Sequence, residues 1–119
     1  MKDVILGLWL IVTAGSATLE AHAFLQHAEP AVGSTVQVSP SEVRVLFTEK
    51  IEPAFSTIQV FNAIGKEVDK RDVHLDRPNQ ELLRVSLPPL QAGTYKVVWR
   101  VVSVDTHVTH GTFTFRVVQ

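Results

Sequence analysis

The stretch Gly93-Thr94-Tyr95-Lys96-Val97-Val98-Trp99-Arg100-Val101-Val102 decides the fold, because large apolar residues occupy every second position in it. Successive side chains of a β-strand point to opposite faces, so a period of two places these residues on one side. That face would carry Tyr95, Val97, Trp99 and Val101. The pattern predicts a long, half-buried strand that lays aromatic side chains into a core.

Shorter segments with the same period lie on both sides of this strand. They cover 23–28, 42–47, 56–61 and 81–87 before it and 112–117 after it, with proline and glycine between them. About seven short strands without an amphipathic helix predict an all-β, antiparallel sandwich. The polar stretch 72–80 is predicted to be a surface loop. The predicted core contains five aromatic residues: Phe47, Tyr95, Trp99, Phe113 and Phe115.

The first 21 residues have the composition of a secretory signal peptide. The apolar run Val4–Ala17 is shorter than the ~20 residues that a membrane-spanning helix needs, and a small residue, Ala21, precedes the predicted cleavage site. We therefore predict a leader over 1–21 and one domain over 22–119, with His22 as the first mature residue. A retained anchor and cleavage after Ala23, which would make Phe24 the first residue, remain alternatives.

The composition excludes several functions. The 119 residues have a formal net charge of −1 and a pI near 6.5, so there is no basic surface for nucleic acid or anionic lipid. The chain has no cysteine, and its one methionine is Met1. No nucleophile motif or phosphate-binding glycine loop is present, which argues against an enzyme. We predict a monomer.

The candidate ligands are nitrogen and oxygen donors. An N-terminal His22 would offer an α-amine and an imidazole that can chelate one ion. His107 adds a second imidazole and Asp105 a carboxylate, two residues apart and on one face if the backbone is extended. Gly111 would then permit a tight turn after the pair. This donor set suits one Cu(II) per chain, whereas Cu(I) prefers the sulfur ligands that a mature chain would lack.

Three other residues are weaker candidates. Glu49 follows the strand 42–47 and could orient a ligand from outside the metal's own shell. His27 could supply an alternative ligand from the same edge strand as His22, and His110 could turn toward the metal from three residues beyond His107. For each of them, a solvated surface side chain is the alternative interpretation.

Five segments of the sequence resemble the CopC/PcoC family of periplasmic copper-binding proteins: His22-Ala23-Phe24-Leu25, Glu29-Pro30-Ala31-Val32-Gly33-Ser34, Val45-Leu46-Phe47-Thr48-Glu49, the block from Gly93 to His107, and Gly111-Thr112-Phe113-Thr114-Phe115. The resemblance implies an immunoglobulin-like sandwich in the periplasm with Cu(II) at one end. It also implies that the family's N-terminal histidine corresponds to His22, its Asp-x-His pair to Asp105 and His107, and its glutamate near copper to Glu49.

The leading hypothesis is therefore a periplasmic Cu(II)-binding protein for copper resistance, homeostasis or uptake, with an inner-membrane transporter of the CopD type as the expected partner. Some family members have a methionine-rich loop for Cu(I), which this chain lacks. Two alternatives remain at this stage. A small copper mono-oxygenase could use the same histidine brace, and a metal-free sandwich could serve as an interaction module.

Overall fold

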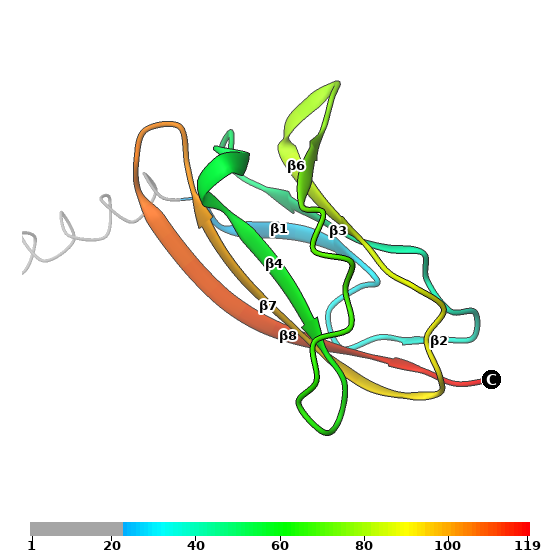
Figure 1. The fold of residues 1–119 in the computed structure, drawn as a ribbon. Helices are drawn as coiled ribbons and strands as arrows, with labels where there is room; N and C mark the ends of the chain where they lie inside the picture. The colour runs from blue at the N-terminus through cyan, green and yellow to red at the C-terminus, as the bar shows by residue number, and fades with distance from the viewer. Residues whose placement is uncertain (1–22) are drawn as a thin grey trace, which may run out of the picture.

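The computed structural model describes residues 23–119, so His22 and the predicted leader lie outside the described residues. These 97 residues form a sandwich of two four-stranded sheets (Figure 1). One sheet has the order β1-β3-β6-β5 and the other the order β2-β8-β7-β4. The strands are β1 (Leu25–Glu29), β2 (Thr35–Val36), β3 (Glu42–Phe47), β4 (Thr57–Phe61), β5 (His74–Asp76), β6 (Asn79–Ser86), β7 (Gly93–Val102) and β8 (Val108–Val117).

The predicted all-β sandwich is confirmed, and its core is the one that the period-two pattern indicates. Side chains from the inner faces of both sheets meet there, as expected when two twisted sheets pack face to face. Phe47 of one sheet contacts Trp99 of the other edge to face, with ring centroids 5.2 Å apart. Tyr95 stacks on Phe115 within the second sheet. All five predicted core aromatics are buried.

Four details differ from the sequence-based expectation. The segment 72–80 was predicted to be a loop, but it contains strand β5 and the turn of a β-hairpin, since β5 pairs with β6. β2 was not predicted; its two residues pair parallel with β8, so the sandwich is not purely antiparallel. β8 begins at Val108, four residues before the predicted start. His110 and Gly111 therefore belong to a strand and not to the connection.

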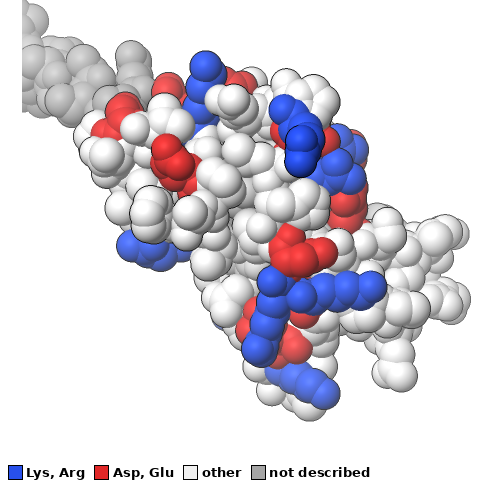
Figure 2. Space-filling view, turned by 45° about the horizontal axis from the view of Figure 1, so that its top comes forward, with Lys and Arg blue, Asp and Glu red and all other residues white. Residues whose placement is uncertain are grey.

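Ion pairs hold the short strand β5 in place, which explains why a polar segment is ordered. Arg84 of β6 contacts Glu42 of β3 at 2.9 Å and Asp76 of β5 at 2.7 Å. On the face drawn in Figure 2, acidic and basic side chains are intermixed, in keeping with the near-zero net charge.

A short 3-10 helix at Pro53–Phe55 leads into β4. It lies at the same end of the sandwich as the β7–β8 turn and the start of the described chain, and the C-terminus lies at the opposite end (Figure 1). Among residues 23–119, no helix has the length and hydropathy required to cross a bilayer.

Asp72 gives the fold a pH-dependent contribution. Its carboxylate accepts a 2.7 Å hydrogen bond from the backbone N–H of Ser86. Hydrogen bonding to the Ser86 side chain and then to its backbone lowers the pKa of Asp72 below the ordinary 3.8. Because the folded-state pKa is depressed, the ionised carboxylate stabilises the fold above pH 3.8, and this contribution is lost as the pH falls through the lower folded-state value.

The variant Asp72→Asn tests this contribution, because it keeps an oxygen acceptor and removes the charge. We expect it to unfold at lower urea concentration than the wild type at neutral pH, with the difference shrinking as the pH falls below 3.8. Ser86→Ala, which keeps the backbone N–H, should lie between the two. A difference that is the same at neutral and acid pH would contradict the assignment.

Candidate metal centre

A tight turn between β7 and β8 brings Asp105 and His107 together. The turn is closed by the backbone N–H of Ser103, which donates to the carbonyl of His107 at 3.0 Å, and by that of Thr106, which donates to Ser103 at 2.8 Å. Thr106 has a left-handed backbone with φ of 75°. Oδ1 of Asp105 lies 3.5 Å from Nδ1 of His107. The two side chains are neighbours, as predicted, but a turn rather than an extended backbone makes them so.

Ser103 positions both members of the pair, and sequence reasoning missed it. It is fully buried, its hydroxyl donates to Oδ1 of Asp105, and its Oγ accepts from the backbone N–H of His107 at 3.3 Å. The Ser103 hydrogen bond, with the nearby His107 imidazole, lowers the pKa of Asp105 below its ordinary value. Asp105 is therefore an anion at neutral pH. Serine hydroxyls commonly bond to backbone two to four residues away, which was the available signal.

The start of the described chain lies against this turn. Ala23 is fully buried, and its carbonyl accepts a 2.6 Å hydrogen bond from the hydroxyl of Thr109, two residues after His107. Thr48 fixes the next residue twice: its hydroxyl accepts from the N–H of Phe24 at 2.9 Å, and its own N–H donates to the Phe24 carbonyl at 3.0 Å. The residue that follows His22 in sequence is thus anchored beside the Asp105–His107 turn.

Glu49 lies between these two segments. Its neighbour Thr48 bonds to Phe24, and its other neighbour, Lys50, accepts a 3.0 Å hydrogen bond from the backbone N–H of Val104. The Glu49 side chain is half-buried. The three segments 23–24, 48–50 and 103–109 therefore meet at one end of the sandwich.

The two weaker histidine candidates lie apart from the turn. His27 is on the outer surface of β1, where its Nε2 is 3.6 Å from Oε2 of Glu29. His110 is in β8, directly opposite Arg100 of β7. Gly111 does not form a turn; it faces Trp99 across the strand pair.

Within residues 23–119, no three His, Asp or Glu side chains form a set that could hold a metal ion. The Asp105–His107 pair offers one imidazole nitrogen and one carboxylate, both about half exposed. Two such donors leave a divalent ion needing further ligands. The chemistry of the pair is thus that of a partial metal site that needs further ligands.

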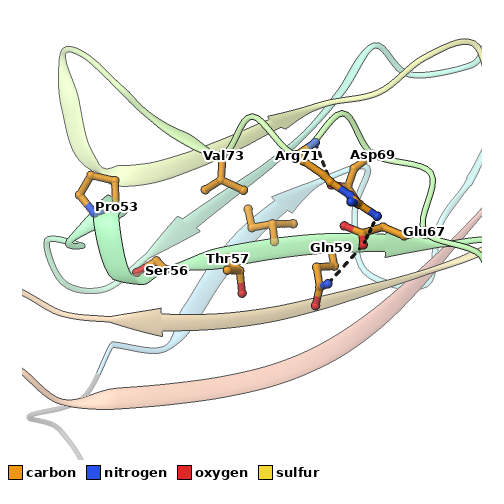
Figure 3. Close-up of a pocket in the computed structure, with 9 residues that line it drawn as sticks. Pro53, Ser56, Thr57, Gln59, Glu67, Asp69, Arg71 and Val73 are labelled. Carbon is orange, nitrogen blue, oxygen red and sulfur yellow. Dashed lines mark hydrogen bonds and ion pairs between the residues drawn. The ribbon is translucent and has the colours of Figure 1, made fainter.

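The main hollows of the described residues are not lined by residues of the Asp105–His107 turn. One, of about 470 Å³, runs beside β4 and is lined by Gln59, Glu67 and Arg71 among others (Figure 3). Glu67 is engaged there, because its Oε1 lies 3.2 Å from Arg71 and 3.4 Å from the Gln59 amide. The Glu67 carboxylate is thus paired with Arg71, and the carboxylate of Asp69, which also lines the hollow, accepts hydrogen bonds from the backbone N–H groups of Val60 and Arg71, so both are engaged within the protein.

Comparison with known proteins identifies the family of this chain. The CopC domain model matches residues 25–118. This chain belongs to the CopC family. Copper resistance protein C of Pseudomonas syringae pv. tomato is 36% identical over 108 residues, covering 86% of this chain and 85% of that protein.

The structure of CopC from Methylosinus trichosporium OB3b superposes with a TM-score of 0.76 at 33% identity, covering 81% of this chain and 93% of that one. The copper transport protein CutJ of Bacillus subtilis is 30% identical over 98 residues, which are 82% of this chain and 18% of CutJ. The function of this CopC-family chain is therefore tied to copper.

Proposed function

We propose that this protein is exported to the periplasm, is cleaved after Ala21, and holds one Cu(II) for copper resistance, homeostasis or uptake. The ligands are the α-amine and imidazole of His22, the imidazole of His107 and the carboxylate of Asp105. The observation that carries the proposal is the 2.6 Å hydrogen bond from Thr109 to the carbonyl of Ala23. This bond anchors Ala23, the residue after His22, to Thr109, which lies two positions after His107.

Burial of Ala23 supports this cleavage site over the one after Ala23. A cut after Ala23 would remove a fully buried residue and the hydrogen-bond acceptor of Thr109. The part-buried hydroxyl of Thr109 would then lose its partner. Cleavage after Ala21 keeps both interactions and leaves His22 as the first residue. The domain is then 22–119.

The donor set favours oxidised copper. Three nitrogens and one carboxylate oxygen match the tetragonal coordination that Cu(II) prefers, and the chain from His22 on contains no sulfur ligand for Cu(I). Glu49, half-buried between the two anchored segments, would stabilise the centre from outside the ligand shell. We propose metal binding rather than catalysis as the role of the centre.

The partner that we propose is an inner-membrane copper transporter of the CopD type. CutJ supports this, since a segment like this domain forms 18% of a longer protein named for copper transport. A domain that is fused to a transport protein in one relative is suited to act beside one when it is separate.

Paired histidine variants test the centre. We expect His107→Ala to weaken Cu(II) binding by at least about a hundredfold, or ~3 kcal/mol, because it removes a ligand. His110→Ala is the matched control, three residues away on β8, and should change the affinity by less than about twofold. Competition of Cu(II) with a chelator of known affinity measures both, and equal affinities for the two variants would refute the ligand set.

A further inference from the structure

The two sheets of the sandwich differ in the charges that their strands carry. The strands of the second sheet, β2, β4, β7 and β8, contain three basic residues and no Asp or Glu. Those of the first sheet contain four acidic residues and two arginines. The near-zero net charge of the chain conceals this division, and the sequence-based expectation of no basic surface is therefore wrong for the second sheet.

The three basic side chains of the second sheet point away from the core. Lys96 and Arg100 are exposed and alternate with the buried side chains of β7, as Arg116 does with those of β8. Arg116 pairs with Thr94, so the three cations lie level with positions 94, 96 and 100 of β7. At about 3.3 Å per residue they form a row of roughly 20 Å. We call the outward surface of β7 and β8 along this row the basic face.

The cations of the basic face have no acidic partner within the described part of the chain, since none of the three takes part in an ion pair or a side-chain hydrogen bond there. The arginines of the first sheet differ: Arg44 lies 3.5 Å from Glu29, and Arg84 lies 2.9 Å from Glu42. His110, which lies opposite Arg100, adds no negative charge. Cations without partners dominate the electrostatic potential outside a surface. The basic face should therefore attract anions.

The side chains between the cations are small. Thr94, Thr112 and Thr114 are exposed there, and all four aromatic side chains of β7 and β8 are buried in the core. Stable protein interfaces usually centre on buried aromatic or arginine anchors in well-packed pockets, and β7 and β8 offer no outward aromatic side chain. A layer of phosphate groups requires only cations and hydrogen-bond donors, which lysine, arginine and threonine supply.

A hollow of about 560 Å³ adjoins the basic face. It lies between β7 and the turn that follows β4, and its lining includes Phe61, Lys96 and Val98. A lipid headgroup has a charged phosphate and a less polar glycerol part, so a recess with one cation and apolar walls suits it. This recess favours lipid over a purely polar anion.

We propose that the basic face binds the anionic headgroup surface of a phospholipid membrane. Where this happens rests on the proposed function, which places the protein in the periplasm beside an inner-membrane transporter, but the attraction itself does not depend on copper. Each lysine or arginine near an anionic membrane strengthens binding by about fivefold. Three of them favour an anionic over a neutral membrane by about a hundredfold.

Contact through the basic face would also orient the candidate metal centre. β7 and β8 run along this face and are joined by the turn that carries Asp105 and His107. With the face on a membrane, the strands lie along its surface and the turn lies at the level of the headgroups. This orientation presents the centre sideways to a transporter in the same membrane.

Two triple variants separate the basic face from the total charge of the protein. The face variant combines Lys96→Gln, Arg100→Gln and Arg116→Gln. The control variant combines Lys50→Gln, Lys70→Gln and Arg77→Gln, which are exposed cations outside the second sheet. Each variant loses three positive charges, so the two have the same net charge.

Flotation of copper-free exported protein with vesicles measures the binding. At low salt we expect the wild type to bind vesicles of equal parts phosphatidylglycerol and phosphatidylcholine at least about tenfold more tightly than vesicles of phosphatidylcholine alone. Added salt should weaken this binding. The face variant should lose at least about tenfold in affinity for the anionic vesicles, and the control variant less than about threefold.

Single cysteines test the orientation, because the chain has none of its own. Thr112→Cys places a fluorophore on the basic face, and Gln80→Cys places one on the exposed side of β6 in the first sheet. Lipids that carry a quencher should quench the label at position 112 more strongly. Equal quenching of the two labels would contradict the orientation.

Three outcomes would overturn the proposal. They are wild-type binding that is equal with and without phosphatidylglycerol, equal losses in the two triple variants, and binding to poly-glutamate but not to vesicles. The last would assign the basic face to an acidic protein. Cu(II) titration of the face variant, which should match the wild type, tests the copper centre separately, so membrane binding and copper binding can fail independently.

Discussion

Substitution of Gly111 by alanine is expected to destabilise the domain by about 2–4 kcal/mol, lowering the thermal midpoint by roughly 10–20 °C. A Cβ at this position would lie 2.6 Å from Cζ2 and 2.9 Å from Cε2 of Trp99. These are ring atoms of a buried side chain that also packs against Phe47. Neither ring can move without disturbing the contact between the two sheets, so the added methyl group overpacks the core.

A double-mutant cycle with Trp99→Phe tests this mechanism. Phenylalanine lacks the part of the indole that a Cβ would strike, so Gly111→Ala should cost less in the Trp99→Phe background than in the wild type. Thr112→Ala is the neighbouring control; its side chain is exposed, and the change should cost less than about 1 kcal/mol. Differential scanning calorimetry measures all four. A Gly111→Ala protein that melts with the wild type would disprove the close packing.

The parts of the fold that were predictable are those in which each strand has one buried face. β3 was predicted with its observed bounds, and β7 likewise, because both alternate large apolar residues with polar or smaller ones. Period-two patterning records burial on one side, and burial on one side is what a two-layer sandwich imposes on its central strands.

The parts of the fold that were not predictable do not show this period-two pattern of apolar residues. β2 has two residues, too few to show a period. β5 is polar and is held by the Arg84–Asp76 ion pair, an interaction between residues that only the fold brings together. Gly111 was interpreted as a turn residue, whereas its role is to leave room for Trp99. A glycine within a strand pattern is a sign of such close approach.

The residues of the candidate centre likewise include some that the sequence predicted and one that it did not. Residue type and spacing identified Asp105 and His107 as a pair, and the structure places them 3.5 Å apart. Ser103, which is buried and holds both of them through one hydroxyl, was missed: its spacing of two and four residues was a signal, but the hydrogen bonds themselves depend on the geometry of the turn. The contribution of His22 stays a prediction, since it lies outside the described residues.

The largest effect on copper is expected from the N-terminus itself. Adding Met-Ala-Pro-Pro before His22 converts its α-amine into an amide, which is a far weaker metal donor at neutral pH, and breaks the chelate ring that the amine forms with the imidazole. The two prolines lack the amide N–H groups through which the new N-terminus could otherwise chelate Cu(II) together with the histidine. We expect Cu(II) affinity to fall by at least about a thousandfold, or ~4 kcal/mol, and the electron paramagnetic resonance spectrum to change with the loss of a nitrogen ligand.

Proteolytic removal of the four added residues provides the control, because it restores the native N-terminus in the same sample and should restore both affinity and spectrum. Intact mass of the exported protein supplies the second arm of the test, since a chain that begins at Phe24 lacks the proposed ligand altogether. Copper binding that is indifferent to the extension would mean that the ion is held without the α-amine. In that case the proposed ligand set would be wrong, because within residues 23–119 Asp105 and His107 form only a partial site.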